Sequence, residues 1–168
     1  MISSLKLSLR ILSLLFVYST GCGLLGGGEP SIPRAKGYQV SAPAGWKLKE
    51  TGVESDTTYT LPSGNVATVT SSCNRPYEAS PEVLTRQLLI GTRNISFDKR
   101  ERMTVNGVEG LFSSVKASAD GRPLYMQILV LSKKACVFDF TLVSPKQISE
   151  NESQEFLGFV RRFKYGND

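Results

Sequence analysis

Residues 95–143, ISFDKRERMTVNGVEGLFSSVKASADGRPLYMQILVLSKKACVFDFTLV, contain four strand-like segments in a row. The pairs Asn-Gly at 106–107 and Asp-Gly at 120–121 are strong hairpin signals, because both positions tolerate a positive φ. We expect the third turn at 133–134. Strands joined by tight turns favour an antiparallel sheet. The predicted strands are 95–105, 108–118, 124–132 and 136–143.

The last two of these strands alternate between apolar and other residues, which is the pattern of a strand with one buried face. The alternating sets are Leu124, Met126, Ile128 and Val130 in one strand and Cys136, Phe138, Phe140 and Leu142 in the next. The opposite faces are also partly apolar, with Leu129, Leu131, Val137 and Val143. We therefore expect central strands that are covered, at least partly, on both sides.

The segments before this meander predict more strands and one helix. A short strand at 38–41, a second opened by Trp46 and a hairpin with its loop at 62–65 precede residue 74. The following helix has a fitting N-cap in Ser80, proline at its first position, and a C-terminal stop at Gly91. Its expected buried stripe is Val83, Leu84, Leu88 and Leu89.

A second helix is predicted at the C-terminal end. Ser149 and Glu152 have the spacing of a capping box, and aromatic and apolar residues follow at helical spacing. These residues are Phe156, Phe159, Val160 and Phe163. Such a stripe favours packing against the sheet over binding a ligand. The fold class is therefore α+β, with an antiparallel sheet of about six strands and two main helices.

The first residues have the order of an export signal. Residues 1–10 carry two basic residues and no acidic one, residues 11–18 are apolar, and small residues lead to Cys22. The apolar run is shorter than the roughly 20 residues that a membrane-spanning helix needs. Residues 19–22, Ser-Thr-Gly-Cys, resemble the lipobox of bacterial lipoproteins. The alternative is an ordinary secretion signal with an incidental cysteine.

The lipobox resemblance implies cleavage before Cys22 and two or three acyl chains on that residue. Several chains make a stable anchor, whereas one binds only marginally. Residues 1–21 would then be the signal peptide, 22–36 a lipidated flexible tether rich in Gly and Pro, and 37–166 one α+β domain. Gly23 stands where an aspartate favours inner-membrane retention in enterobacterial lipoproteins, which favours the outer membrane, facing the periplasm.

Charge and composition exclude several function classes. The chain has 20 Lys and Arg against 15 Asp and Glu, and removing Lys6 and Arg10 with the signal leaves a net charge of +3. That is too mild and too scattered for a nucleic-acid binder. Histidine is absent, which removes the usual catalytic triads and imidazole zinc sites. We expect no cofactor, no metal and no enzyme activity.

Two cysteines remain after Cys22. Because the periplasm is oxidising, Cys73 and Cys136 are expected to form a disulfide; the alternative is two separate buried thiols. The loop at 71–80, SSCNRPYEAS, offers Asn74, Arg75 and Tyr77 as a partner-binding group, since arginine and tyrosine are frequent at interfaces. The alternative is a plain connection between a strand and a helix.

Two further residues have a functional and a structural interpretation. Trp46 is a possible ligand platform, but a single tryptophan beside a turn favours packing. Asp139 lies in an otherwise apolar strand, where pairing with an arginine or facing water is favoured over catalysis.

The segments YQVSAPAGWK at 38–47 and FLGFVRRFKYG at 156–166, together with the order of elements, resemble the PsbP-like fold. This family includes a photosystem II extrinsic subunit, Ran-binding proteins and bacterial exported proteins. The resemblance implies a module that binds or stabilises larger assemblies. The predicted function is a lipid-anchored, non-catalytic module for an envelope protein complex. The alternatives are a small-lipid carrier and a carboxylate-based hydrolase or transferase.

Overall fold

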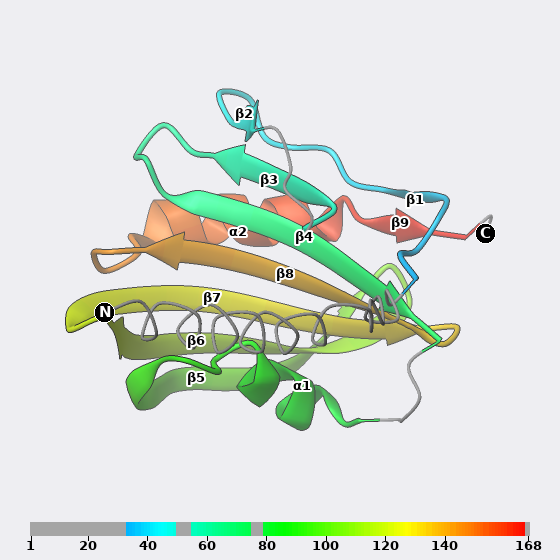
Figure 1. The fold of residues 1–168 in the computed structure, drawn as a ribbon. Coiled ribbons are helices and arrows are strands. Elements are labelled where there is room, and N and C mark those ends of the chain that lie inside the picture. The colour runs from blue at the N-terminus through cyan, green and yellow to red at the C-terminus, as the bar shows by residue number, and fades with distance from the viewer. Residues whose placement is uncertain (1–32, 50–54, 75–78, 167–168) are drawn as a thin grey trace, which may run out of the picture. The chain divides into compact units, whose positions relative to one another are not determined.

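A seven-stranded antiparallel sheet in the order β2-β3-β4-β8-β7-β6-β5 forms the centre of the computed structural model (Figure 1). The structure describes residues 33–49, 55–74 and 79–166. The strands of this sheet are β2 (Lys47–Lys49), β3 (Thr57–Thr60), β4 (Val66–Cys73), β5 (Arg93–Val105), β6 (Val108–Ala119), β7 (Arg122–Lys133) and β8 (Cys136–Ser144). A separate pair joins β1 (Tyr38–Gln39) to β9 (Lys164–Tyr165). The helices are α1 (Pro81–Gln87) and α2 (Glu150–Arg161).

The α+β class is confirmed, and the sheet has one strand more than the six expected.

Within the described residues no helix is long and apolar enough to cross a membrane.

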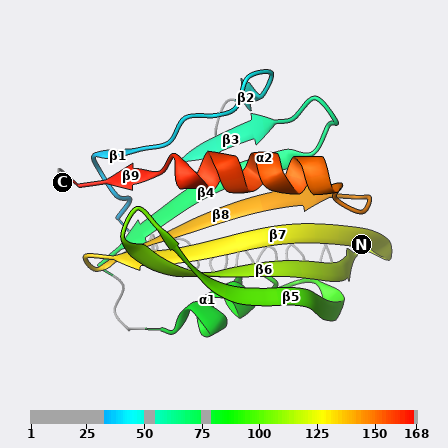
Figure 2. The same ribbon diagram turned by 180° about the vertical axis from the view of Figure 1, so that it is seen from behind.

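The two helices cover opposite faces of the sheet, as the front and back views show (Figures 1 and 2). Helix α2 packs on the face that carries Phe138, Phe140 and Leu142. Helix α1 packs on the other face, through Leu84 and its neighbours. Two separate apolar clusters therefore stabilise the sheet, and both are made of residues between 35 and 165.

The register of β7 and β8 explains why both faces of these strands are apolar. Leu129 pairs with Phe140 on the α2 side, and the next pair, Val130 with Asp139, lies on the α1 side. Side chains alternate across a strand, so every second residue of β7, namely Leu124, Met126, Ile128 and Val130, faces α1. The expectation of central strands covered on both sides is confirmed.

Helix α2 agrees with its prediction. Ser149 is the N-cap, and its side chain and that of Glu152 form the reciprocal capping box. The predicted stripe is fully buried, at 0% exposure for Phe156, Phe159, Val160 and Phe163. Phe163 lies just after the helix, which ends at Arg161, so only the first three belong to α2. Full burial of such side chains is worth about 1.5–3 kcal/mol each relative to exposure, so this stripe is the main attachment of α2 to the sheet.

Helix α1 is shorter than predicted. Ser80 and Pro81 begin it as expected, but it ends at Gln87, not close to Gly91. The next residues form tight turns, in which the N–H of Leu89 donates to the carbonyl of Arg86. These turns bury Leu89, whereas Val83, predicted to be buried, is 47% exposed because it lies on the outer side of this short helix.

The meander also agrees with its prediction, apart from one turn. The positive φ angles predicted at 106–107 and 120–121 are present. The third turn lies one residue later, at Lys134 and Ala135, because Lys133 still pairs with Cys136 in the ladder.

Strand β5 forms one edge of the sheet and is highly charged. Lys99 pairs with Glu101 at 2.8 Å, and both are exposed. Its register with β6 shifts twice, between Arg93 and Ser96 and between Phe97 and Lys99. This edge is therefore charged and irregular along its length.

Candidate functional site

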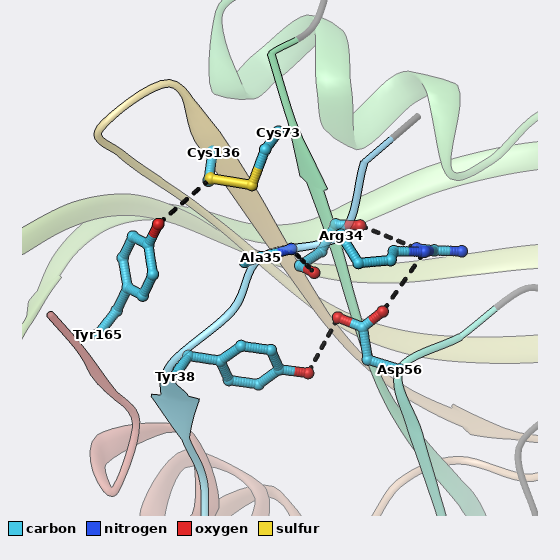
Figure 3. The surroundings of a disulfide bond; sticks show 8 residues. Arg34, Ala35, Tyr38, Asp56, Cys73, Cys136 and Tyr165 are labelled. Atoms are coloured by element: carbon cyan, nitrogen blue, oxygen red, sulfur yellow. Dashed lines mark hydrogen bonds and ion pairs between the residues drawn. A yellow bond between two sulfur atoms is a disulfide. The ribbon is translucent and has the colours of Figure 1, made fainter. Parts of the chain in front are cut away.

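The disulfide joins the last residue of β4 to the first residue of β8 (Figure 3). Cys73 and Cys136 are directly opposite in the register, with their Cα atoms 4.0 Å apart and the S–S bond 1.99 Å long. Both are nearly buried, at 7% and 6% exposure. The N–H of Cys73 donates to the carbonyl of Pro33, not across the strand pair. The predicted disulfide is thus present, and the beginning of the described chain lies against it.

The residues after Pro33 are fastened to β4. Arg34 Nη1 donates to the carbonyl of Ser71 at 2.8 Å, and the N–H of Ala35 donates to Ser71 Oγ at 2.8 Å. Arg34 Nε also pairs with Asp56 Oδ1 at 3.5 Å, and that carboxylate side chain is only 12% exposed. We call Arg34, Tyr38, Asp56 and Ser71 the clasp.

The phenol of Tyr38 completes the clasp from the other side of Asp56 (Figure 3). Its hydroxyl donates to Asp56 Oδ2 at 2.9 Å, and its ring packs edge-on against Phe138 with centroids 5.4 Å apart. Burial, and next the bond to the Asp56 carboxylate, raises the pKa of Tyr38 above its ordinary value. The phenol therefore stays protonated, which is the form that donates to Asp56.

The same segment is joined to the C-terminal end of the chain. Tyr38 and Tyr165 are partners in the β1–β9 pair. The hydroxyl of Tyr165 lies 3.4 Å from Cys136 Sγ, and its ring packs against Phe138 at 4.8 Å between centroids. Residues from both ends of the described chain therefore meet at the disulfide. We call this part of the domain the disulfide end.

A pocket of about 260 Å³ lies at the disulfide end. Two hydrogen bonds fix its wall: Lys133 Nζ donates to the carbonyl of Tyr165 at 3.1 Å, and Asn106 Nδ2 donates to that of Phe163 at 2.6 Å. Its lining combines apolar and aromatic residues with two lysines and no acidic residue, so it suits a small anionic group better than a cation. Its lining residues are Asn106, Val108, Lys133, Phe163, Lys164, Tyr165 and Gly166.

Of the predicted partner-binding residues, the structure describes Asn74. It is exposed, has a φ of 51°, and donates its N–H to the carbonyl of Ala135. Asn74 therefore lies at the disulfide end, beside the turn between β7 and β8. Arg75 and Tyr77 lie outside the described residues, as do Cys22, the predicted signal peptide and most of the predicted tether.

Trp46 is a core residue, as the packing interpretation predicts. It is 8% exposed, and its ring lies 5.1 Å from that of Phe159.

Asp139 is 8% exposed, so it does not face water as one interpretation proposed. The residues opposite it in the flanking strands are Thr70 and Val130, so no second carboxylate is paired with it in the sheet.

The described residues hold no group of three or more cysteine, aspartate and glutamate side chains that suits a metal ion.

The clasp and the pocket were not predicted from the sequence. Arg34 and Ser71 are separated by 37 positions and Tyr38 and Asp56 by 18, so no local pattern links them. A hint is available in Tyr165, since an aromatic residue just after a predicted helix end requires a packing partner.

The sequence matches no family model, and a search of curated proteins finds no match either. Among solved structures, the fold is similar to cyanobacterial PsbP (CyanoP) from Synechocystis sp. PCC 6803, with a TM-score of 0.57 and 14% identity, covering 86% of this chain and 96% of that one. A protein from Bacteroides thetaiotaomicron has a TM-score of 0.53 and 12% identity, covering 78% of this chain and 46% of that one. LpqN of Mycobacterium tuberculosis, described as involved in cell envelope biogenesis, has a TM-score of 0.48 and 12% identity, covering 82% of this chain and 86% of that one. The likeness to CyanoP confirms the PsbP-like fold.

Proposed function

We propose that the chain is a non-catalytic binding or assembly module for an envelope protein complex, held at a bacterial membrane through acyl chains on Cys22. Residues 19–22 resemble the lipobox, although Ser19 stands where leucine is commonest, and the Gly- and Pro-rich segment that follows suits a tether. We place the domain on the periplasmic side of the outer membrane, because Gly23 follows the cysteine.

The observation that carries this proposal is the way in which the chain enters the domain. Arg34 binds β4 and Asp56, and Tyr38 pairs with the C-terminal strand, so the first residues that the structure describes are held from two sides. A mechanical force applied at the N-terminal end of the domain would therefore be distributed over β4, β9 and the core beneath them. This arrangement suits a domain that is attached to a membrane through its N-terminal end.

The packing of the interior favours this function over that of a lipid carrier. A carrier needs an apolar cavity between the sheet and α2, but aromatic rings fill that space. Phe138 and Phe163 are both fully buried, with ring centroids 4.7 Å apart. The pocket at the disulfide end has lysines in its wall, which does not suit an acyl chain.

A carboxylate-based hydrolase or transferase lacks support among the described residues. Such an enzyme needs two carboxyl groups that face one substrate, with different pKa values. Asp139 is nearly buried within the sheet between Thr70 and Val130.

The anchoring half of the proposal is tested by the mass of the mature N-terminal peptide. We expect it to begin at Cys22 and to carry two or three acyl chains, and we expect Cys22→Ala to abolish both cleavage and acylation. A mature chain that begins elsewhere and carries no fatty acid would contradict the anchor.

The binding half is tested by chemical crosslinking in cells, followed by purification of the chain. We expect the parent chain to crosslink to a defined envelope partner. In the variant Arg75→Ala/Tyr77→Ala, the yield of this crosslink should be at least about tenfold lower than in the parent, since such residues are frequent hot spots. The matched control is Arg122→Ala/Tyr125→Ala, which changes the same residue types near the beginning of β7. Equal loss in both variants, or no partner at all, would contradict the proposed role of the loop.

A further inference from the structure

Four basic residues gather at the disulfide end. Lys133 and Lys164 line the pocket, and a Cβ atom placed on Gly166, another lining residue, would lie 3.2 Å from Lys134 Nζ. The backbone of Arg161 lies close to them, because its carbonyl accepts a hydrogen bond from the pocket residue Asn106. We call Lys133, Lys134, Arg161 and Lys164 the basic cluster.

The basic cluster holds more positive charge than the whole mature chain. The chain from Cys22 onward has a net charge of +3, so the remaining residues sum to −1 once these four are removed. Glu109 is the acidic residue that the strand order places nearby, next to Val108 of the pocket. Counting it still leaves a net charge of +3 for these five described residues.

The basic cluster is open to solvent and to other molecules. Lys134, Arg161 and Lys164 are exposed. In the part of the chain that the structure describes, these three form no ion pair with a carboxylate; the ion pairs present there join other residues. Their charge is therefore available to an outside partner.

The chain enters the domain beside the basic cluster. The carbonyl of Pro33 bonds to the N–H of Cys73, and the adjacent Asn74 bonds to Ala135, which follows Lys134 directly. Pro33 comes 11 positions after Cys22, and even a fully extended chain of this length spans no more than roughly 40 Å. Acyl chains on Cys22 would thus keep Pro33 within that distance of the lipid headgroups, and the basic cluster lies at the same end of the domain as Pro33.

We propose that the basic cluster is a docking surface for anionic phospholipid headgroups. That the basic cluster lies close to a membrane rests on the proposed lipid anchor. Its charge and its position in the domain come from the sequence and the fold. Anionic membranes attract basic groups that come within a Debye length, which is about 8 Å at physiological ionic strength. Lys133 and Lys164 are both lining residues of the pocket, so a phosphate group that enters it would lie close to basic residues. Acyl chains and a basic patch together form the two-signal type of membrane attachment.

The test uses the chain from Gly23 to Asp168, which lacks Cys22 and contains every residue of both core clusters. Circular dichroism and thermal unfolding establish that it is folded. Its binding is measured by co-sedimentation with vesicles of phosphatidylcholine alone and of an equimolar mixture of phosphatidylcholine and phosphatidylglycerol. We expect binding to the mixed vesicles only. Raising the salt from about 0.1 M to about 1 M, which shortens the Debye length from about 10 Å to about 3 Å, should abolish it.

The decisive variant is Lys134→Gln/Arg161→Gln/Lys164→Gln. Each basic side chain near an anionic membrane strengthens binding about fivefold, so the triple variant should bind about 100-fold more weakly. Lys133 is kept because it also bonds to the carbonyl of Tyr165. The control variant is Arg93→Gln/Arg122→Gln/Lys146→Gln, which removes the same charge at the other end of the sheet and should bind nearly as well as the parent.

Failure of the parent chain to bind the mixed vesicles overturns the docking surface, and so does equal weakening in both triple variants. Binding to an acidic protein without binding to vesicles would assign the cluster to a protein partner and also overturn it. Because the chain from Gly23 carries no acyl group, none of these results depends on the state of Cys22. The anchor is judged separately by the mass of the mature N-terminus.

Discussion

The side-chain amide of Asn65 donates a 2.7 Å hydrogen bond to Glu152 Oε1, which joins the β3–β4 turn to the first turn of α2. The other carboxylate oxygen of Glu152 accepts from the N–H and the hydroxyl of Ser149. Two parts of the chain that are 87 positions apart therefore share one carboxylate.

This carboxylate makes the domain sensitive to acid. Hydrogen bonds from the Ser63 side chain, then from the backbone of Ser149, lower the pKa of Glu152 below its usual value of 4.5, against the opposing effect of burial. A lowered pKa stabilises the fold above about pH 4.5, and this contribution is lost as the pH falls through the folded-state pKa.

We expect Glu152→Gln to lower the free energy of unfolding at about pH 7, with a difference from the parent that shrinks below about pH 4. Urea denaturation at both pH values measures it. The control is Glu155→Gln on the exposed side of α2, which should change stability by less than about 0.5 kcal/mol. A constant difference across the pH range would contradict the assignment.

Tyr38→Phe removes the hydroxyl that bonds to Asp56 and leaves a partly buried carboxylate with one partner fewer. We expect the free energy of unfolding at neutral pH to fall by about 1.5–3 kcal/mol, the range for hydrogen bonds to charged groups. Tyr125→Phe is the control, with an expected change within about 0.5 kcal/mol. Urea denaturation of both variants tests the clasp.

The raised pKa of Tyr38 has a consequence at alkaline pH. Burial and the Asp56 bond favour the neutral phenol, so its contribution to stability is complete below the ordinary pKa of 10 and is lost as the pH rises toward the folded-state value. We expect the parent to lose more stability above about pH 10 than Tyr38→Phe does. Parallel alkaline slopes in the two proteins would show that Tyr38 does not carry this effect.

Reduction of the disulfide should destabilise the domain without changing its fold. The bond closes a loop with a sequence separation of 63. Chain entropy predicts a loss of at most about 4 kcal/mol for a loop of that length. We expect Cys73→Ala/Cys136→Ala to unfold at lower urea concentration than the parent. In the chain from Gly23, an alkylating reagent should add mass only after reduction; labelling without reductant would contradict the bridge.

Gly110 is required by close packing between β6 and its neighbour β7. A Cβ atom there would lie 2.6 Å from the carbonyl oxygen of Val130 and would also collide with Leu131 Cδ2. Overpacking of this kind costs about 1–3 kcal/mol, and we expect Gly110→Ala to lie at the upper end because one obstacle is backbone. Gly158→Ala in α2 is the control: its Cβ meets no atom within 4 Å, so it should stabilise the helix by about 0.5–1 kcal/mol. Thermal unfolding separates the two.

The parts of the fold that depend on local signals were predictable from the sequence. The hairpin turns, the alternation along β7 and β8 and the capping box of α2 each depend on residues that are near neighbours in the chain. The predicted end of α1 was wrong: the helix ends at Gln87, and the chain continues to Gly91 in tight turns that the sequence pattern does not distinguish from a helix.

Of the candidate site, only the disulfide between Cys73 and Cys136 was predictable from the sequence. Two cysteines in an exported chain indicate a disulfide, but the pairing of Tyr38 with Tyr165 joins strands of two residues, which are too short to leave a pattern. The basic cluster was also not predictable. In the sequence, Lys134 and Lys164 are 30 positions apart and look like ordinary surface lysines; only the tertiary arrangement of the strands brings them to one end of the domain.

The charged, irregular edge at β5 affects how copies of this protein can coexist. An open strand edge is a template on which a second chain can add. Burying Lys99 or Glu101 against a neighbouring copy would strip water from a charge, and the two register shifts break the row of groups that a newcomer must match. Dense packing of many copies is therefore compatible with each one remaining separate.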